Sequence, residues 1–236
     1  MNPSSEGRPG GLLVPAVLGV LALAALGVAI LAYQAMTRVP TATARAEAEE
    51  PPLEVDAQLA GAMRIPDFAL VDQTGLPRSR EDFKGRFTIL AFTFTNCPTA
   101  CPIMHSQIIR LQEELRGTPV RIVSISVDPE RDTPEALRAH AERLGAEPSL
   151  WSFWTGDPAV VRSIVSTMGF ALVDDPNLII TLPDGGRMNN IVHPTKLLLI
   201  GPDVSVLAME SGLEWGPARR LAELARRLAL SKPAGN

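Results

Sequence analysis

The feature that most constrains the fold is the apolar run RFTILAFTFT (residues 86–95), which is followed at once by a cysteine-containing loop and a helical pattern. The run is apolar at successive positions and rich in Phe, Thr and Ile, which is typical of a central strand covered on both faces. Apolar residues then recur at helical spacing from Met104 to Leu115, until Gly117 provides a residue suited to a helix C-terminus. We therefore expect a strand, a loop and a helix in this order.

A similar alternation continues along the chain. The run VRIVSISV (120–127) is strand-like, and Thr133 can cap a helix that begins at Pro134 and ends near Gly145. A strand, a helix and a further strand favour a parallel pair with a crossover, so we expect an α/β domain with a central mixed sheet flanked by helices. Other elements are expected as follows: a strand at 68–71, a helix at 158–168, hairpins turning at 184–186 and 201–203, and a helix at 217–230.

The residues that precede this domain predict a membrane anchor and a tether. The run 12–33 carries no charge and, as a single transmembrane helix, can cross about 30 Å of hydrocarbon. A short tail (1–11) precedes it, and residues 34–62, rich in Ala, Glu and Pro, predict a flexible linker. A cleaved signal peptide is the alternative, because 42–44 (Ala-Thr-Ala) resembles a cleavage site, but its apolar core is normally only about 7 to 15 residues long.

The domain itself is expected over residues 63–231, with a C-terminal tail at 232–236. Positive charges on either side of the run 12–33 do not decide its orientation. A short tail, one span and a folded domain behind them suggest a signal anchor. We therefore expect a single-pass protein of the bacterial inner membrane whose domain lies in the periplasm or otherwise outside the cytoplasm.

Composition excludes some classes of function. The chain has 236 residues, 46% of them hydrophobic, a formal net charge of -4 and a pI near 5.5. It therefore lacks the basic footprint that nucleic-acid binding requires. The 2 cysteines cannot form a disulfide framework, and a chain of this size does not need one. A chemical role for the cysteines is favoured over a structural one.

The two cysteines, Cys97 and Cys101, stand four positions apart in the motif NCPTACP. If they flank the first helical turn, their sulfurs lie on one face and can meet, on the same arc as the apolar positions from Met104 onward. Free backbone amides and the helix dipole at this end favour thiolate over thiol. Such a pair suits either a disulfide or a metal ion, and the spacing leaves both chemistries open.

A third metal ligand must come from the three histidines. His105 stands about 12 Å along the helix from Cys97, too far for one ion to bind both easily, and His140 lies between leucines in the next helix. His193 precedes the strand KLLLI, in a loop at a sheet end, where sites commonly form, and is therefore preferred. Two thiolates and an imidazole suit copper in either oxidation state, or zinc with a water ligand; Met104 and Met188 are read as apolar core.

Four ordered blocks make the chain resemble the SCO/SenC family of thioredoxin-like copper proteins, which assemble cytochrome c oxidase: FTFTNCPTACP, SVDPERDTPEAL, WSFWTGDPAVVRSIVSTMGF and HPTKLLLIGPD. The resemblance covers nearly all of residues 65–230. It implies a thioredoxin-like domain in which Cys97, Cys101 and His193 bind Cu⁺ or Cu²⁺. It also implies a role for Asp128 beside this site.

The resemblance further implies that the protein is a copper metallochaperone for the binuclear copper site of oxidase subunit II, or for another copper-accepting protein. The alternative is a thiol–disulfide oxidoreductase that reduces the cysteines of such a site, with Cys97 attacking and Cys101 resolving. Of these two hypotheses we favour the metallochaperone, and whether the protein is also an enzyme stays open. A peroxidase is disfavoured, because Phe94 occupies the position of the threonine in the peroxiredoxin motif.

The chain departs from the family pattern at three positions near the expected ligands. Thr99 stands where an Asp is common, and Val192 and Pro194 stand where an Asp and a Ser commonly flank the histidine. The missing carboxylate removes a group that could orient the imidazole. The three donors themselves are retained.

Overall fold

The computed structural model describes residues 26–34 and 51–231. Residues 26–34 form a helix, and the chain from Pro52 onward forms a compact unit. The expected tails, 1–11 and 232–236, and most of the expected membrane span 12–33 lie outside the described residues. Within the described ranges, no helix combines the length and the apolar character needed to cross a membrane.

A seven-stranded mixed sheet forms the centre of the domain, in the order β2-β1-β5-β4-β3-β8-β9. The three central strands β5, β4 and β3 run parallel, and the strands added on either side are antiparallel. This sheet confirms the expected α/β class with a mixed sheet. The strands span β1 (Ala69–Asp72), β2 (Pro77–Ser79), β3 (Thr88–Thr93), β4 (Arg121–Ser126), β5 (Trp151–Thr155), β8 (Lys196–Ile200) and β9 (Val206–Ser211).

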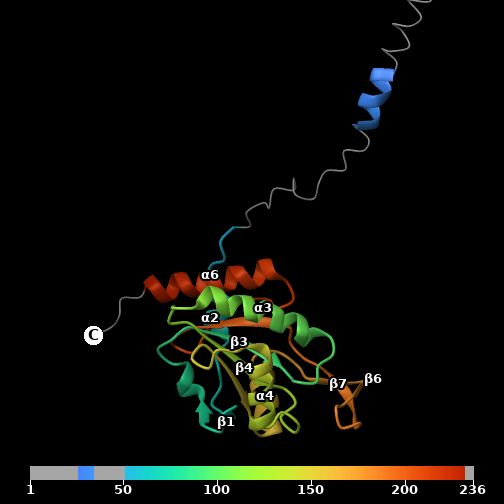
Figure 1. Cartoon of the computed structure of the whole chain (residues 1–236). Coiled ribbons are helices and arrows are strands. Elements are labelled where there is room, and N and C mark those ends of the chain that lie inside the picture. Colours follow the sequence, from blue (N-terminus) through green and yellow to red (C-terminus); the bar gives the residue numbers. More distant parts are fainter. Residues whose placement is uncertain (1–25, 35–50, 232–236) are drawn as a thin grey trace, which may run out of the picture. The chain divides into compact units, whose positions relative to one another are not determined.

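The helices cover both faces of the sheet. Alternate residues of β3 divide the core: Leu90 and Phe92 pack with α5, whereas Ile89 and Ala91 pack with α3, α4 and α6. Helices α3 and α6 lie side by side over the sheet (Figure 1). The helices span α2 (Ala57–Ala62), the 3-10 helix η2 (Arg80–Phe83), α3 (Ala100–Leu115), α4 (Pro134–Leu144), α5 (Pro158–Thr167) and α6 (Trp215–Ser231).

The end of the expected flexible linker is ordered, which corrects the range 34–62. Asp56 caps α2 by accepting hydrogen bonds from the N–H groups of Gln58 and Leu59, at 2.9 and 3.0 Å. The N–H of Asp56 also donates to the carbonyl oxygen of Leu207 at 2.7 Å, which ties this segment to β9. A six-residue helix is too short to show apolar periodicity, so the composition of the segment gave no sign of it.

Strand β5 was not expected, although it lies between β4 and β1. Four of its five residues are buried, so it lacks the alternation of polar and apolar residues that marks a half-exposed strand. Its position is fixed by distant partners. The indole N–H of Trp151 donates to Ser124 Oγ at 3.0 Å, and the N–H of Phe153 donates to Gln73 Oε1 at 2.9 Å.

A separate two-stranded sheet, formed by β6 (Val173–Thr181) and β7 (Arg187–Val192), leads into the region of His193. Its turn lies at 184–186, as predicted, and Gly185 has a φ of +85°, which favours glycine. A register shift between Asp175 and Ile179 interrupts β6. The hairpin connects α5 to β8 and thereby delivers His193 to the edge of the main sheet.

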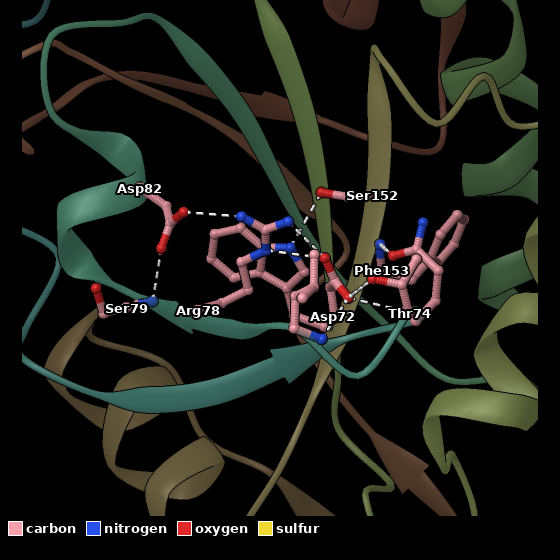
Figure 2. A network of polar contacts seen from close by, with 10 residues as sticks. Asp72, Thr74, Arg78, Ser79, Asp82, Ser152 and Phe153 are labelled. Atoms are coloured by element: carbon pink, nitrogen blue, oxygen red, sulfur yellow. Dashed lines mark hydrogen bonds and ion pairs between the residues drawn. The ribbon is translucent and has the colours of Figure 1, made fainter.

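A polar network closes the turn between β1 and β2, the two strands at one edge of the main sheet. Figure 2 shows the buried carboxylate of Asp72, which accepts hydrogen bonds from the N–H and hydroxyl of Thr74 at 2.8 and 2.6 Å. Arg78 donates to the same carboxylate from Nε and Nη2, at 2.9 and 2.5 Å, and also pairs with Asp82. Because these strong acceptors are satisfied, the network stabilises the fold without offering a free group for chemistry.

Candidate metal centre

The topology of the sheet brings Cys97, Cys101 and His193 to one edge. Cys97 follows β3, and Cys101 is the second residue of α3. His193 lies just before β8, which pairs antiparallel with β3, so the start of β8 stands beside the end of β3. Residues far apart in the sequence therefore meet at the carboxyl end of a central parallel strand, where loops commonly form sites in open α/β sheets.

The three side chains converge to form a compact and buried group. One donor atom from each lies within 4.8 Å of the other two. His193 Nε2 stands 3.4 Å from Cys101 Sγ and 3.8 Å from Cys97 Sγ. All three residues are buried: His193 is 8% exposed, Cys101 is 1% exposed and Cys97 is 7% exposed. Both cysteines are free thiols, so the structure represents the reduced pair.

The imidazole of His193 is oriented by its own chain. Its Nδ1 lies 3.1 Å from the carbonyl oxygen of Pro194. Because a carbonyl oxygen can only accept, Nδ1 carries a proton, and Nε2 is the ring nitrogen that faces the sulfurs. The ring of Phe94 packs edge-on against the imidazole, with centroids 5.6 Å apart. The backbone carbonyl of Pro194 therefore provides an orienting acceptor in a chain that lacks the Asp common before the histidine. Val192, which takes the place of that Asp, is exposed.

The two thiols differ in their electrostatic surroundings. Cys97 Sγ accepts hydrogen bonds from the Cys101 thiol and from the Cys101 backbone N–H, the latter at 3.4 Å. The hydrogen bond from the Cys101 thiol is the largest cause that lowers the pKa of Cys97, and the hydrogen bond with His193 lowers this pKa further. The same bond raises the pKa of Cys101, because the proton that it donates is retained, and burial raises that pKa further. Cys97 is therefore the thiolate of the pair at neutral pH, and Cys101 holds the shared proton.

The cysteines face a different part of the core from the one expected. They pack with Phe94, Ile125 and other residues on the α5 side of the sheet, whereas Met104 packs on the opposite side. Cys101 nevertheless shares the buried face of α3 with Met104, as predicted. Cys97 precedes α3 by three positions, so helical projection does not apply to it.

The other two histidines form a separate pair. His105 and His140 face each other with ring centroids 4.9 Å apart, and Nε2 of each is buried without a hydrogen-bond partner. Neither belongs to the cluster of metal-ligating side chains found among the described residues. Met104 packs in the core beneath α3, and Met188 is a buried residue of β7.

Of the two aspartates in the loop SVDPERDTP, Asp132 rather than Asp128 reaches the cysteine loop. Asp128 pairs with Arg131 at 2.8 Å, and burial raises its pKa to about 6. Asp132 instead accepts hydrogen bonds from Thr95, two residues before Cys97. Asp132 was not predicted from the sequence, because it lies in the polar segment before the cap of α4. Its position in the same loop as Asp128 was the available signal.

The arrangement offers two kinds of chemistry. Two cysteine sulfurs, once both are deprotonated, and one imidazole nitrogen form a donor set of the kind that binds copper or zinc. The two sulfurs are also close enough to each other to take part in thiol–disulfide exchange. The donor set fits a soft metal ion without any change in the identity of its residues.

Comparisons with known proteins show which family the chain is similar to. The model of the SCO1/SenC family matches residues 56–229. The SCO1 protein homolog of Bacillus subtilis is 34% identical over 155 residues, which cover 65% of this chain and 76% of the relative.

Two solved structures extend the likeness to the fold. BsSco, described with a disulfide switch and as a member of the Sco family of cytochrome c oxidase assembly proteins, is 28% identical with a TM-score of 0.58, over 77% of this chain and 97% of the other. Bradyrhizobium japonicum ScoI with copper bound is 25% identical with a TM-score of 0.54, over 70% and 99% of the two chains. These matches confirm the thioredoxin-like fold.

Proposed function

The chain belongs to the SCO1/SenC family, and on this premise we propose that it is a membrane-anchored copper metallochaperone that delivers copper to the binuclear copper site of cytochrome c oxidase subunit II. The observation that carries the proposal is the position of His193 Nε2, which faces both sulfurs at 3.4 and 3.8 Å. The three donor atoms are already close together in the folded chain. Similarity to a family does not by itself give the distances between these atoms.

Copper is the cargo that the donor set favours. Thiolates are soft ligands that select Cu(I), and an imidazole suits copper as well as zinc. The copper-bound relative supports the choice of copper over zinc. The low pKa of Cys97 keeps one thiolate available for binding, and a metal ion would displace the proton that Cys101 holds.

Transfer to another protein requires that the ion can leave. A site with three protein donors keeps room for an incoming ligand, so an acceptor thiolate can enter before a donor departs. Val192, beside His193, is half exposed, which places one rim of the buried site at the surface. An acceptor that docks at this rim can exchange ligands without unfolding the domain.

The anchor and the location are part of the same proposal. The uncharged run 12–33 would hold the protein in the bacterial inner membrane, with the domain outside the cytoplasm. A reporter that is active only in the cytoplasm, fused to the C-terminus, should be inactive. An active reporter would contradict this orientation.

The delivery step is tested by mixing copper-loaded protein with the copper-free, reduced soluble domain of oxidase subunit II and measuring copper in each after separation. We expect copper to move to the subunit II domain. A matched mixture with an acceptor whose cysteines have been alkylated is the control and should show no transfer. Equal copper in both mixtures, or no movement in either, would contradict the proposal.

A second candidate function, thiol–disulfide oxidoreductase, is favoured by the contrast between the two thiols. In that reaction the Cys97 thiolate attacks a disulfide of the partner, forms a mixed disulfide and releases one partner thiolate. Cys101 then loses its proton and attacks Cys97 Sγ, which releases the second partner thiol. The chain ends with one disulfide, and the partner ends with two thiols. This activity needs no imidazole, so a His193→Ala variant that keeps reductase activity would select it over copper delivery.

A further inference from the structure

The loop between β3 and α3 is tied to the loop that precedes α4. The backbone N–H of Thr95 donates to Asp132 Oδ2 at 3.1 Å, and its hydroxyl donates to Asp132 Oδ1 at 2.5 Å. The hydroxyl of Ser126, at the end of β4, donates to Asp132 Oδ2 at 2.5 Å. One carboxylate therefore accepts three hydrogen bonds, two from the loop that follows β3 and one from the end of the adjacent parallel strand β4, at the edge where the metal-ligating residues meet.

Asp132 is held firmly enough to act as an anchor. Its side chain is completely buried, and its backbone N–H donates to the carbonyl oxygen of Asp128 at 2.9 Å. The next residue, Thr133, caps α4 through its side chain. A buried carboxylate is costly unless its oxygens are hydrogen-bonded, so these contacts fix the place of both partners.

Thr95, which Asp132 holds in place, belongs to the loop that contains the two sulfur ligands. Thr95 lies between Phe94 and Cys97, and the N–H of Cys97 returns to the carbonyl oxygen of Phe94 at 3.4 Å. The N–H of Phe94 donates to Cys101 Sγ at 3.4 Å, and its ring contacts His193. A shift of Thr95 would therefore move the backbone that positions both sulfurs and one face of the imidazole.

We propose that Asp132 is a positioning residue for the Cys97–Cys101–His193 site and acts through Thr95. Asp132 has no hydrogen bond to either sulfur or to the imidazole among the described contacts. Its charge also acts on Cys101, so Thr95→Val, which keeps that charge, is the variant that isolates the effect on geometry. The inference rests on the proposed function where copper is the readout. It predicts weaker copper binding when the link is broken, by about 10-fold or more, the range found for groups that orient metal ligands.

The test compares Thr95→Val with Thr95→Ser. Valine has nearly the shape of threonine but lacks the hydroxyl that donates to Asp132, whereas serine keeps it. Asp132→Asn is the partner variant, because its amide nitrogen cannot accept a hydrogen bond. Asp157→Ala is the matched control: Asp157 caps α5 by accepting from the N–H groups of Ala159 and Val160 and has no hydrogen bond to the cysteine loop among the described contacts.

Two quantities are measured on the full reduced protein: the affinity for Cu(I), by competition with a colorimetric chelator, and the rate at which iodoacetamide alkylates Cys97. Denaturant unfolding of each variant gives its global stability. We expect Thr95→Val and Asp132→Asn to lose copper affinity and to change the alkylation rate. We expect Thr95→Ser and Asp157→Ala to match the wild type in both, even though Asp157→Ala is destabilised by the loss of its helix cap.

Each alternative result has a distinct meaning. Wild-type affinity and alkylation in Thr95→Val and Asp132→Asn would overturn the inference, and so would equal losses in Asp157→Ala, since general loosening of the fold would then explain the losses. If the wild type itself binds no copper, the proposed function fails. The alkylation rates still decide the positioning role in that case, because they do not depend on copper.

Discussion

The three histidines of the chain occupy two regions that differ in what faces the imidazole. All three are buried, with exposures of 8% for His193, 4% for His105 and 9% for His140. At the metal centre, Nδ1 of His193 is hydrogen-bonded to a carbonyl oxygen and Nε2 faces two sulfurs. In the second region, beneath α3 and α4, His105 and His140 face each other among aromatic rings.

The contrast shows that burial alone does not indicate a ligand. His105 stands one helical turn from Cys101, closer in sequence than His193, yet it points into the apolar core between α3 and α4. Burial lowers the pKa of His105 to about 3 and that of His140 to about 4, so both are neutral in the folded protein. What distinguishes His193 is a ring oriented by a backbone carbonyl and two sulfurs close enough to share one ion with it.

The largest expected effect comes from removing a sulfur. Cys101→Ser should lower the affinity for Cu(I) by more than about 100-fold, because the loss of a direct soft ligand should exceed the 10- to 100-fold cost of removing a group that only orients one. The affinity is measured by chelator competition on the reduced protein. His105→Leu is the matched control from the other region and should bind copper as the wild type does. Equally weak copper binding by Cys101→Ser and His105→Leu would contradict the distinction between the metal centre and the buried histidine pair.

The next effect belongs to the buried pair and depends on pH. Both histidines stay neutral in the folded protein but protonate near pH 6.5 once unfolded. Stability is therefore fully present above about pH 6.5 and falls as the pH drops toward 4 and 3. Each group contributes at most about 1.4 kcal/mol per pH unit. His105→Leu should remove one contribution, so its free energy of unfolding should fall less steeply below pH 6.5.

Asp128 makes the opposite contribution to the pH dependence of stability between about pH 4 and pH 6. Its pKa is about 6 in the folded protein against 3.8 for the free group, so its contribution to stability is present below about pH 4 and is lost as the pH rises to 6. The comparison between wild type and His105→Leu cancels this contribution. Urea unfolding at pH 7, 6, 5 and 4 provides the measurement, and parallel pH profiles for the two proteins would show that His105 is not kept neutral by the fold.

The smallest effect concerns Arg143, whose Nη2 lies 3.1 Å from His140 Nδ1. Arginine can only donate, so Nδ1 accepts and the ring proton lies on the buried Nε2. Burial is the main cause of the low pKa of His140, and the positive charge of Arg143 adds to it. Arg143→Gln should raise this pKa slightly, changing stability at pH 5 by less than about 1 kcal/mol because Arg143 is exposed. An NMR titration of the His140 ring checks the shift, and a lower pKa would contradict the expectation.

Much of the fold follows from patterns that are local. The strand before the cysteines, the caps Thr133 and Asp157, and the turns near Gly185 and Pro202 each depend on neighbours in sequence, and the structure contains them. Strand β5 and helix α2 were missed because they are short and owe their conformation to distant partners.

The site was predictable to a similar extent. Spacing placed Cys97 beside Cys101, and the position of His193 before a strand put it at a sheet end. The pairing of β8 with β3, which makes the three meet, is a tertiary fact that no local pattern contains. The same holds for Asp132, whose partner Thr95 is 37 residues away, and for the burial of His105 against His140.

The central claim is that one imidazole, that of His193, completes a copper site with the two sulfurs. It is tested most directly by the affinity for Cu(I) of the reduced wild type, His193→Ala and His140→Ala, measured side by side. The account predicts that His193→Ala loses affinity by at least about 10-fold, as expected when a metal ligand or its support is removed, and that His140→Ala does not. Undiminished copper binding by His193→Ala would contradict it.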